Sequence, residues 1–61
     1  MKRITMARIA INTFAAGSDS DREDLLCDLL TDLMHWADRD GLDFFEEYER
    51  AKMHYTEEAG Q

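Results

Sequence analysis

The clearest pattern in the chain is a run of apolar residues at helical spacing in its middle third. These positions recur so that they share one side of a helix, and they are Leu25, Leu26, Leu29, Leu30, Leu33, Met34, Trp36 and Ala37. Ser20 stands three residues before Glu23, which is the spacing of a capping box at a helix start. Gly41 is the residue type that commonly adopts a left-handed conformation just past a helix end. The pattern therefore predicts a helix over residues 21–39.

A second helix is predicted almost immediately afterwards. Asp43 and Glu46 repeat the capping-box spacing, with an aspartate as the cap. One narrow face rich in aromatic residues then recurs at spacings of four, three and four residues, formed by Phe44, Tyr48, Ala51 and Tyr55. This pattern predicts a helix over about residues 44–58. The short connection between the two helices predicts an antiparallel helical hairpin.

The first 17 residues are apolar and basic, with a less regular pattern. Ile4 and Met6 alternate, as do Ile9 and Ile11, but the phase slips between the two pairs. The segment is compatible with a short strand, an irregular arm or a weak helix, and its β-branched residues favour an extended arm. The predicted organisation is an N-terminal arm over residues 1–17 and an acidic helical hairpin over residues 18–61. A strand in the arm would make the fold class α+β.

The apolar side of the first predicted helix is wider than one partner helix covers. It spans roughly 180°, so the part that the second helix leaves open has to meet the arm, a second copy of the chain or another protein. A chain of 61 residues with a single cysteine, Cys27, has no intramolecular disulfide to support a small core. We therefore predict an all-α hairpin with an N-terminal extended arm or short strand, assembled as a homodimer.

Charge is distributed unevenly along the chain. Lys2, Arg3 and Arg8 give the first 17 residues a charge of +3, whereas the remainder carries 14 acidic against four basic residues, a net charge of −10. The whole chain has a formal net charge of −7. Such a surface repels nucleic acid and anionic membranes and attracts basic partners.

The compartment is predicted from what the sequence lacks. Lys2 and Arg3 resemble the start of a signal peptide, but Arg8, Asn12 and Thr13 interrupt the apolar stretch that follows. No run approaches the roughly 20 apolar residues of a membrane span. A lone cysteine is typical of a reducing compartment, so we expect a cytoplasmic protein.

One face of the first predicted helix is acidic. Four aspartates follow at spacings of three, four and four residues, and a fifth lies at the edge of the same line; we call them the acidic ridge: Asp21, Asp24, Asp28, Asp32 and Asp38. Like charges at these spacings repel one another, and aspartate is a poorer helix former than glutamate. The ridge has two main interpretations: a solvated face that keeps the protein soluble, or a recognition strip for a basic protein surface. A calcium site is disfavoured because a straight helix does not wrap around a cation.

Candidate chemistry is sparse. Cys27, His35 and His54 are the only soft or borderline metal ligands, and no pair has the spacing of a zinc site. The sequence contains neither a glycine-rich phosphate loop nor a nucleophile elbow. We predict a protein that is not an enzyme and has no cofactor and no metal. Aromatic residues around the predicted turn belong mainly to the core, and exposed members, of which Trp36, Phe45 and Tyr48 are the candidates, would anchor an interface.

Three parts of the hairpin carry a family resemblance. The run Leu29–Trp36, the turn Gly41–Phe44, and the trio Ala51, His54 and Tyr55 resemble small acidic helical proteins of unknown function encoded by phages, plasmids and integrated mobile elements. The resemblance covers residues 25–58 and implies a mobile-element setting, without catalytic residues. Short acidic proteins from such elements often disarm host defence, as anti-restriction and anti-CRISPR proteins do, some of them by imitating nucleic acid.

The resulting hypothesis is a non-catalytic inhibitor that docks its acidic ridge on the basic surface of a host protein or ribonucleoprotein, without direct contact with nucleic acid or membrane. One alternative is a structural or regulatory homodimer, such as an antitoxin-like or accessory subunit, that binds through its apolar and aromatic face and tolerates salt. A further alternative, a small nucleic-acid binder using the basic N-terminal segment, is disfavoured by the net charge of −7.

Overall fold

A computed structural model describes residues 2–60 of the chain, and this part of the chain is helical throughout, without strands. Its elements are α1 (Lys2–Ala16), the short 3-10 helix η1 (Arg22–Asp24), α2 (Leu25–Arg39) and α3 (Phe44–Ala59). The all-α class and the two helices of the acidic portion are as the sequence predicted. The end of α2 at Arg39 is also confirmed.

The N-terminal segment is a helix, so the predicted extended arm, with its short-strand alternative, is wrong. Ile4, Ala7, Ile11 and Phe14 are three, four and three residues apart, and α1 therefore gathers them on one side. Ile11, Phe14 and Ala15 are half-buried, whereas the other residues of α1 are exposed. Packing of this one side against α2 outweighs the small helix penalty of the β-branched residues.

The capping box predicted at Ser20 does not form. Asp21 precedes η1 with an extended backbone and no capping hydrogen bond from its side chain, and regular helix begins only at Leu25. The Ser20 hydroxyl instead donates to the Asp28 carboxylate, one turn into α2, and lies 2.6 Å from the Ser18 hydroxyl. The serine therefore ties the α1–α2 connection to the side of α2 rather than capping its end.

The connection between α2 and α3 forms as its sequence predicts. Gly41 has a φ of 75°, and hydrogen bonds run from the Leu42 amide to the Ala37 carbonyl at 2.8 Å and from the Gly41 amide to the Asp38 carbonyl at 3.4 Å. This is the Schellman arrangement that closes helices through a left-handed glycine. The Asp43 carboxylate then accepts a hydrogen bond from the Glu46 amide at 3.1 Å and caps α3.

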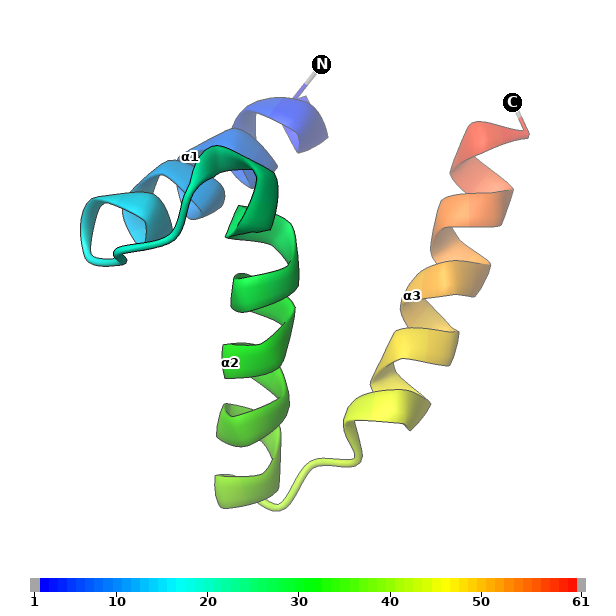
Figure 1. The fold of residues 1–61 in the computed structure, drawn as a ribbon. Coiled ribbons are helices and arrows are strands. Elements are labelled where there is room, and N and C mark those ends of the chain that lie inside the picture. Colours follow the sequence, from blue (N-terminus) through cyan, green and yellow to red (C-terminus); the bar gives the residue numbers. More distant parts are fainter. Residues whose placement is uncertain (1, 61) are drawn as a thin grey trace.

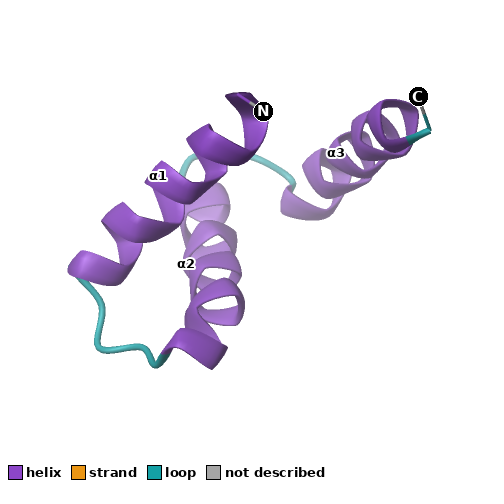
Figure 2. Cartoon of the chain, turned by 90° about the horizontal axis from the view of Figure 1, so that it is seen from above, coloured by secondary structure: helices purple, strands orange, loops and turns teal. Residues whose placement is uncertain are grey.

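The three helices surround an open centre rather than pack into a bundle. Central α2 contacts α1 at one end and α3 at the other, and α3 diverges from it beyond the turn (Figure 1). The view from above shows the same separation (Figure 2). The helices of the predicted hairpin thus run in opposite senses without packing along their length. Arg3 on α1 meets Glu58 on α3 in an ion pair of 3.2 Å, between side chains that are both exposed.

The interior is correspondingly small. Ala37, beside the turn, is the only buried residue within residues 2–60. The chain exposes 5676 Å², whereas a compact protein of 7.1 kDa exposes about 4,100 Å². Its radius of gyration is 13.1 Å, against about 10.5 Å expected for this length. The helices are therefore formed, but most of the apolar surface that should stabilise them is still in contact with solvent.

Candidate protein-binding surface

The wide apolar side of α2 is only partly used by the fold. Leu25 and Leu29, near its start, are half-buried beneath α1, and Ala37 is buried beside the turn. Between and beside them, one row of large apolar side chains is exposed, formed by Leu26, Leu30, Leu33 and Met34. The sequence predicted that the apolar side of α2 is wider than one partner helix covers, and the uncovered part is exposed in the structure.

The aromatic face of α3 is also uncovered. Phe44, next to the turn, is half-buried, but Tyr48 is 51% exposed and Tyr55 is 69% exposed. Isolated exposed apolar residues are normal on protein surfaces, whereas contiguous ones mark binding sites. We call Phe44, Tyr48, Ala51 and Tyr55 the α3 stripe.

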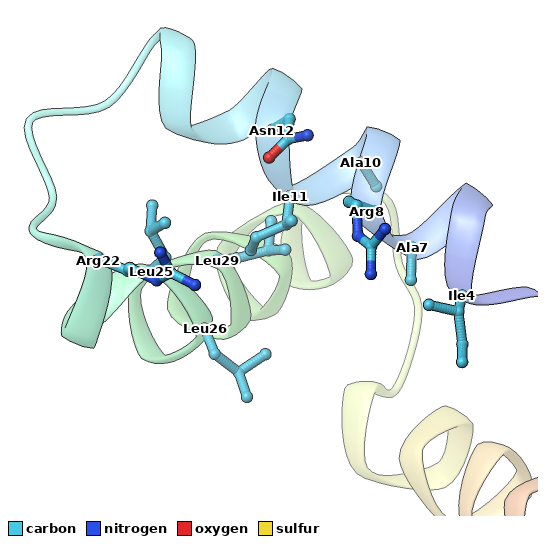
Figure 3. Close-up of a pocket in the computed structure, with 10 residues that line it drawn as sticks. All are labelled: Ile4, Ala7, Arg8, Ala10, Ile11, Asn12, Arg22, Leu25, Leu26 and Leu29. Atoms are coloured by element: carbon cyan, nitrogen blue, oxygen red, sulfur yellow. The ribbon is translucent and has the colours of Figure 1, made fainter.

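A groove of about 920 Å³ lies between α1 and the first turns of α2 (Figure 3). Ile11 and Leu29 lie close together between the two helices, whereas Ile4 and Arg8 on α1 extend into the open space beside them. The lining is mainly aliphatic with two cationic side chains, and comprises Ile4, Ala7, Arg8, Ala10, Ile11, Asn12, Arg22, Leu25, Leu26 and Leu29. We call it the α1–α2 groove.

Sequence reasoning missed the α1 side of this groove. The available signal was the helical spacing of Ile4, Ala7, Ile11 and Phe14. This signal was obscured for two reasons. Met6 and Ile9 are apolar but lie outside that face, and their side chains are exposed. Alternating apolar positions in this segment also resemble the pattern of a strand. Arg8 and Arg22 were noted for their charge alone.

The three aromatic residues predicted as interface anchors all lie exposed. Trp36 on α2 is exposed near the turn, and Tyr48 belongs to the α3 stripe. Phe45 lies outside that stripe and packs edge-on against Phe44, with ring centroids 5.6 Å apart. The turn thus brings aromatic side chains from both helices to the same end of the molecule.

The acidic ridge is less regular than its spacing implied. Asp21 precedes the helical turns, and half-buried Asp28 accepts the hydrogen bond from Ser20, so neither belongs to a free row along α2. Asp21, Asp24, Asp32 and Asp38 are exposed, and within residues 2–60 no ion pair or side-chain hydrogen bond engages their side chains. Four of the five ridge side chains are therefore exposed and unpaired, and three of them, Asp24, Asp32 and Asp38, lie on the turns of η1 and α2.

Other chemistry is sparse in the part of the chain that the structure describes. Residues 2–60 hold no cluster of three or more carboxylate, histidine or cysteine side chains placed to bind a metal ion. Cys27 is a free, exposed thiol on α2. None of the described helices combines the length and apolar character that crossing a bilayer requires.

Comparison with models of protein families, with curated proteins and with solved structures gave no match for this chain. The exposed apolar and aromatic surface is therefore the main guide to function.

Proposed function

We propose that this chain is a non-catalytic protein-binding module that acts through its apolar and aromatic surface, with a homodimer as its basic form. The observation that carries the proposal is the exposed area of 5676 Å², about 1,600 Å² more than a compact chain of this mass would leave in solvent. Single exposed hydrophobic residues need no partner, but an exposed excess of this size does when Ala37 is the only buried residue among residues 2–60.

The energetics support the same conclusion. Ordering each residue of a helix costs about 1–2 kcal/mol in backbone entropy, and helices of 15 and 16 residues are marginal in water on their own. Burial of apolar side chains normally offsets this cost. Because the isolated chain buries little, its helices need a second polypeptide surface to be stable.

Amide hydrogen exchange at a series of protein concentrations tests the proposal. We expect protection in α1 and α3 to rise with concentration, because association supplies the missing burial. Protection that is independent of concentration, together with one cooperative unfolding transition of a monomer, would contradict it.

An acidic inhibitor of a nucleic-acid-binding host complex, of the anti-CRISPR or anti-restriction type, is the second candidate. It is favoured by the exposed ridge residues on helical turns that have no ionic partner within residues 2–60, Asp24, Asp32 and Asp38. An apolar dimer core and an acidic outer face are compatible, so the same protein could use both surfaces.

The inhibitor candidate is tested by removing those three charges together, as Asp24→Asn, Asp32→Asn and Asp38→Asn. The matched control is Glu46→Gln, Glu49→Gln and Glu57→Gln, which removes the same charge from α3. We expect a host nucleic-acid-binding complex to be retained at low salt by the wild type and the control, and lost with the aspartate variant and at high salt. Equal retention by both variants would exclude the ridge as the contact.

A further inference from the structure

We infer that the α1–α2 groove receives α3 of a second copy of the chain, so that two copies exchange their α3 helices reciprocally. The inference rests on the proposed function and specifies which segment covers which surface. A reciprocal exchange is closed by a twofold axis, because each copy offers one groove and one helix.

The direction of α3 keeps its stripe away from its own groove. The Schellman turn at Gly41 and the Asp43 cap fix the first turn of α3 through backbone and side-chain hydrogen bonds. From there α3 diverges from α2, and exposure of the stripe grows from half-buried Phe44 to Tyr55. The part of the stripe farthest from the turn is thus the part most in need of a partner surface.

The groove and the stripe are complementary in polarity. The groove is a mainly aliphatic surface between two helices (Figure 3). The stripe is a row of one phenylalanine, one alanine and two tyrosines along one face of α3. Tyrosine suits such a contact because its ring is buried while its hydroxyl stays at the polar edge. Arg8 and Arg22 in the groove lining supply that polar edge.

Charge favours the same pairing. Helix α1 carries Lys2, Arg3 and Arg8 and no acidic residue, a net charge of +3, whereas α3 carries five glutamates against two basic residues, a net charge of −3. Within one chain, exposed Arg3 at the start of α1 and Glu58 near the end of α3 form an ion pair of 3.2 Å, so side chains of opposite charge from these two helices are able to meet. Opposite charges on α1 and α3 favour docking of α3 beside α1, and they disfavour docking of two surfaces that carry the same charge.

The area available matches what a stable dimer needs. If each copy covers its excess of about 1,600 Å², the pair buries about 3,200 Å², within the range of about 2,000–5,000 Å² for obligate homodimers. A contact limited to the ends of α3 would leave most of that excess exposed.

Cysteine cross-linking tests the exchange in the full chain, with Cys27→Ser as background. One copy carries Ala7→Cys in the groove, and a size-tagged copy carries Ala51→Cys in the stripe. The control pair is Ile9→Cys with Met53→Cys, on other faces of the same two helices. We expect the mixed disulfide of the first pair to form about tenfold faster or more than that of the control, because docking raises the local thiol concentration.

Two outcomes would overturn the exchange. Equal rates for both pairs would mean that groove and stripe do not meet. A chain carrying Ala7→Cys and Ala51→Cys together that forms an intrachain disulfide as a monomer would mean that α3 folds back on its own groove. If that monomer also unfolds cooperatively, both the exchange and the proposed function are rejected. If it does not unfold cooperatively, only the exchange is rejected.

Discussion

The turn between α2 and α3, which we call the joint, is closed by hydrogen bonds and contains the buried residue Ala37. The outer faces of the same two helices leave their apolar side chains exposed. At the joint, Gly41 is in the left-handed conformation, the Leu42 amide bonds the Ala37 carbonyl, and Asp43 caps α3. Ala37, the only buried residue of the described chain, lies there. The faces that extend from the joint expose leucine, methionine, tryptophan and tyrosine side chains.

The difference separates two sources of structure. The joint depends on contacts between residues a few positions apart, which a single chain always supplies. The faces depend on burial against distant residues, and within residues 2–60 the fold brings few such residues together. We therefore expect substitutions on the faces to alter association and substitutions at the joint to alter the stability of each copy.

The largest expected effect comes from truncating the stripe. Tyr55→Ala should raise the dimer dissociation constant about 30-fold, the effect of losing a hot-spot residue worth about 2 kcal/mol. Met53→Ala is the matched control, because the exposed fractions of Tyr55 and Met53 are 69% and 63%. Sedimentation equilibrium measures both. Equal shifts would mean that the α3 stripe is not the contact.

Next in size is the glycine of the joint. No atom lies within 4 Å of the position that a Cβ would take on Gly41, so Gly41→Ala meets no clash and its effect is purely conformational. At a φ of 75° we expect a loss of about 1–2 kcal/mol in the free energy of unfolding, measured by urea denaturation at fixed concentration.

The matched glycine is Gly17, which also has open space where a Cβ would lie but does not have a positive φ. Gly17→Ala should be neutral or slightly stabilising, because it restricts the unfolded chain without strain in the folded one. A loss as large as that of Gly41→Ala would show that the left-handed turn is not what the joint depends on.

A smaller effect is expected at the cap of α3. Asp43→Ala removes the acceptor for the Glu46 amide and should lower the free energy of unfolding by about 1 kcal/mol, whereas Asp43→Asn should retain most of it. Thermal unfolding followed by circular dichroism gives both values. An asparagine variant as unstable as the alanine variant would point to charge rather than hydrogen bonding.

The smallest effect distinguishes two members of the acidic ridge. Asp28→Asn weakens the charged acceptor of the Ser20 hydroxyl and should cost about 0.5–1 kcal/mol, whereas Asp32→Asn, at an exposed position, should cost nothing. Ser20→Ala should reproduce the loss. If Asp28→Asn and Asp32→Asn change the free energy of unfolding in urea equally, the Ser20–Asp28 hydrogen bond does not stabilise the α1–α2 connection.

Much of the fold was predictable because its determinants are local. The leucine spacing indicated the body of α2, Asp43 and Glu46 indicated the start of α3, and Gly41 indicated the turn between them. These features depend on residues within one or two turns of each other, which is the range over which sequence patterns carry information.

The rest depended on contacts at longer range. Ser20 was assigned as a cap because its neighbours fit a capping box, but its hydroxyl bonds Asp28, eight residues on. The first segment was predicted to be extended because its β-branched residues favour that conformation, but packing of half-buried Ile11 against α2 favours the helix. The direction of α3 has no local signature, so the spacing of the α3 stripe predicted its residues but not that they would be left exposed.

Dimerisation through the apolar and aromatic faces is best tested by sedimentation equilibrium over a wide range of protein concentrations, with helicity recorded by circular dichroism on the same samples. We expect a dimer whose dissociation on dilution coincides with loss of helix, because the second copy supplies burial that residues 2–60 lack on their own. A monomer that keeps its full helix content at every dilution, and unfolds in one cooperative transition, would contradict it.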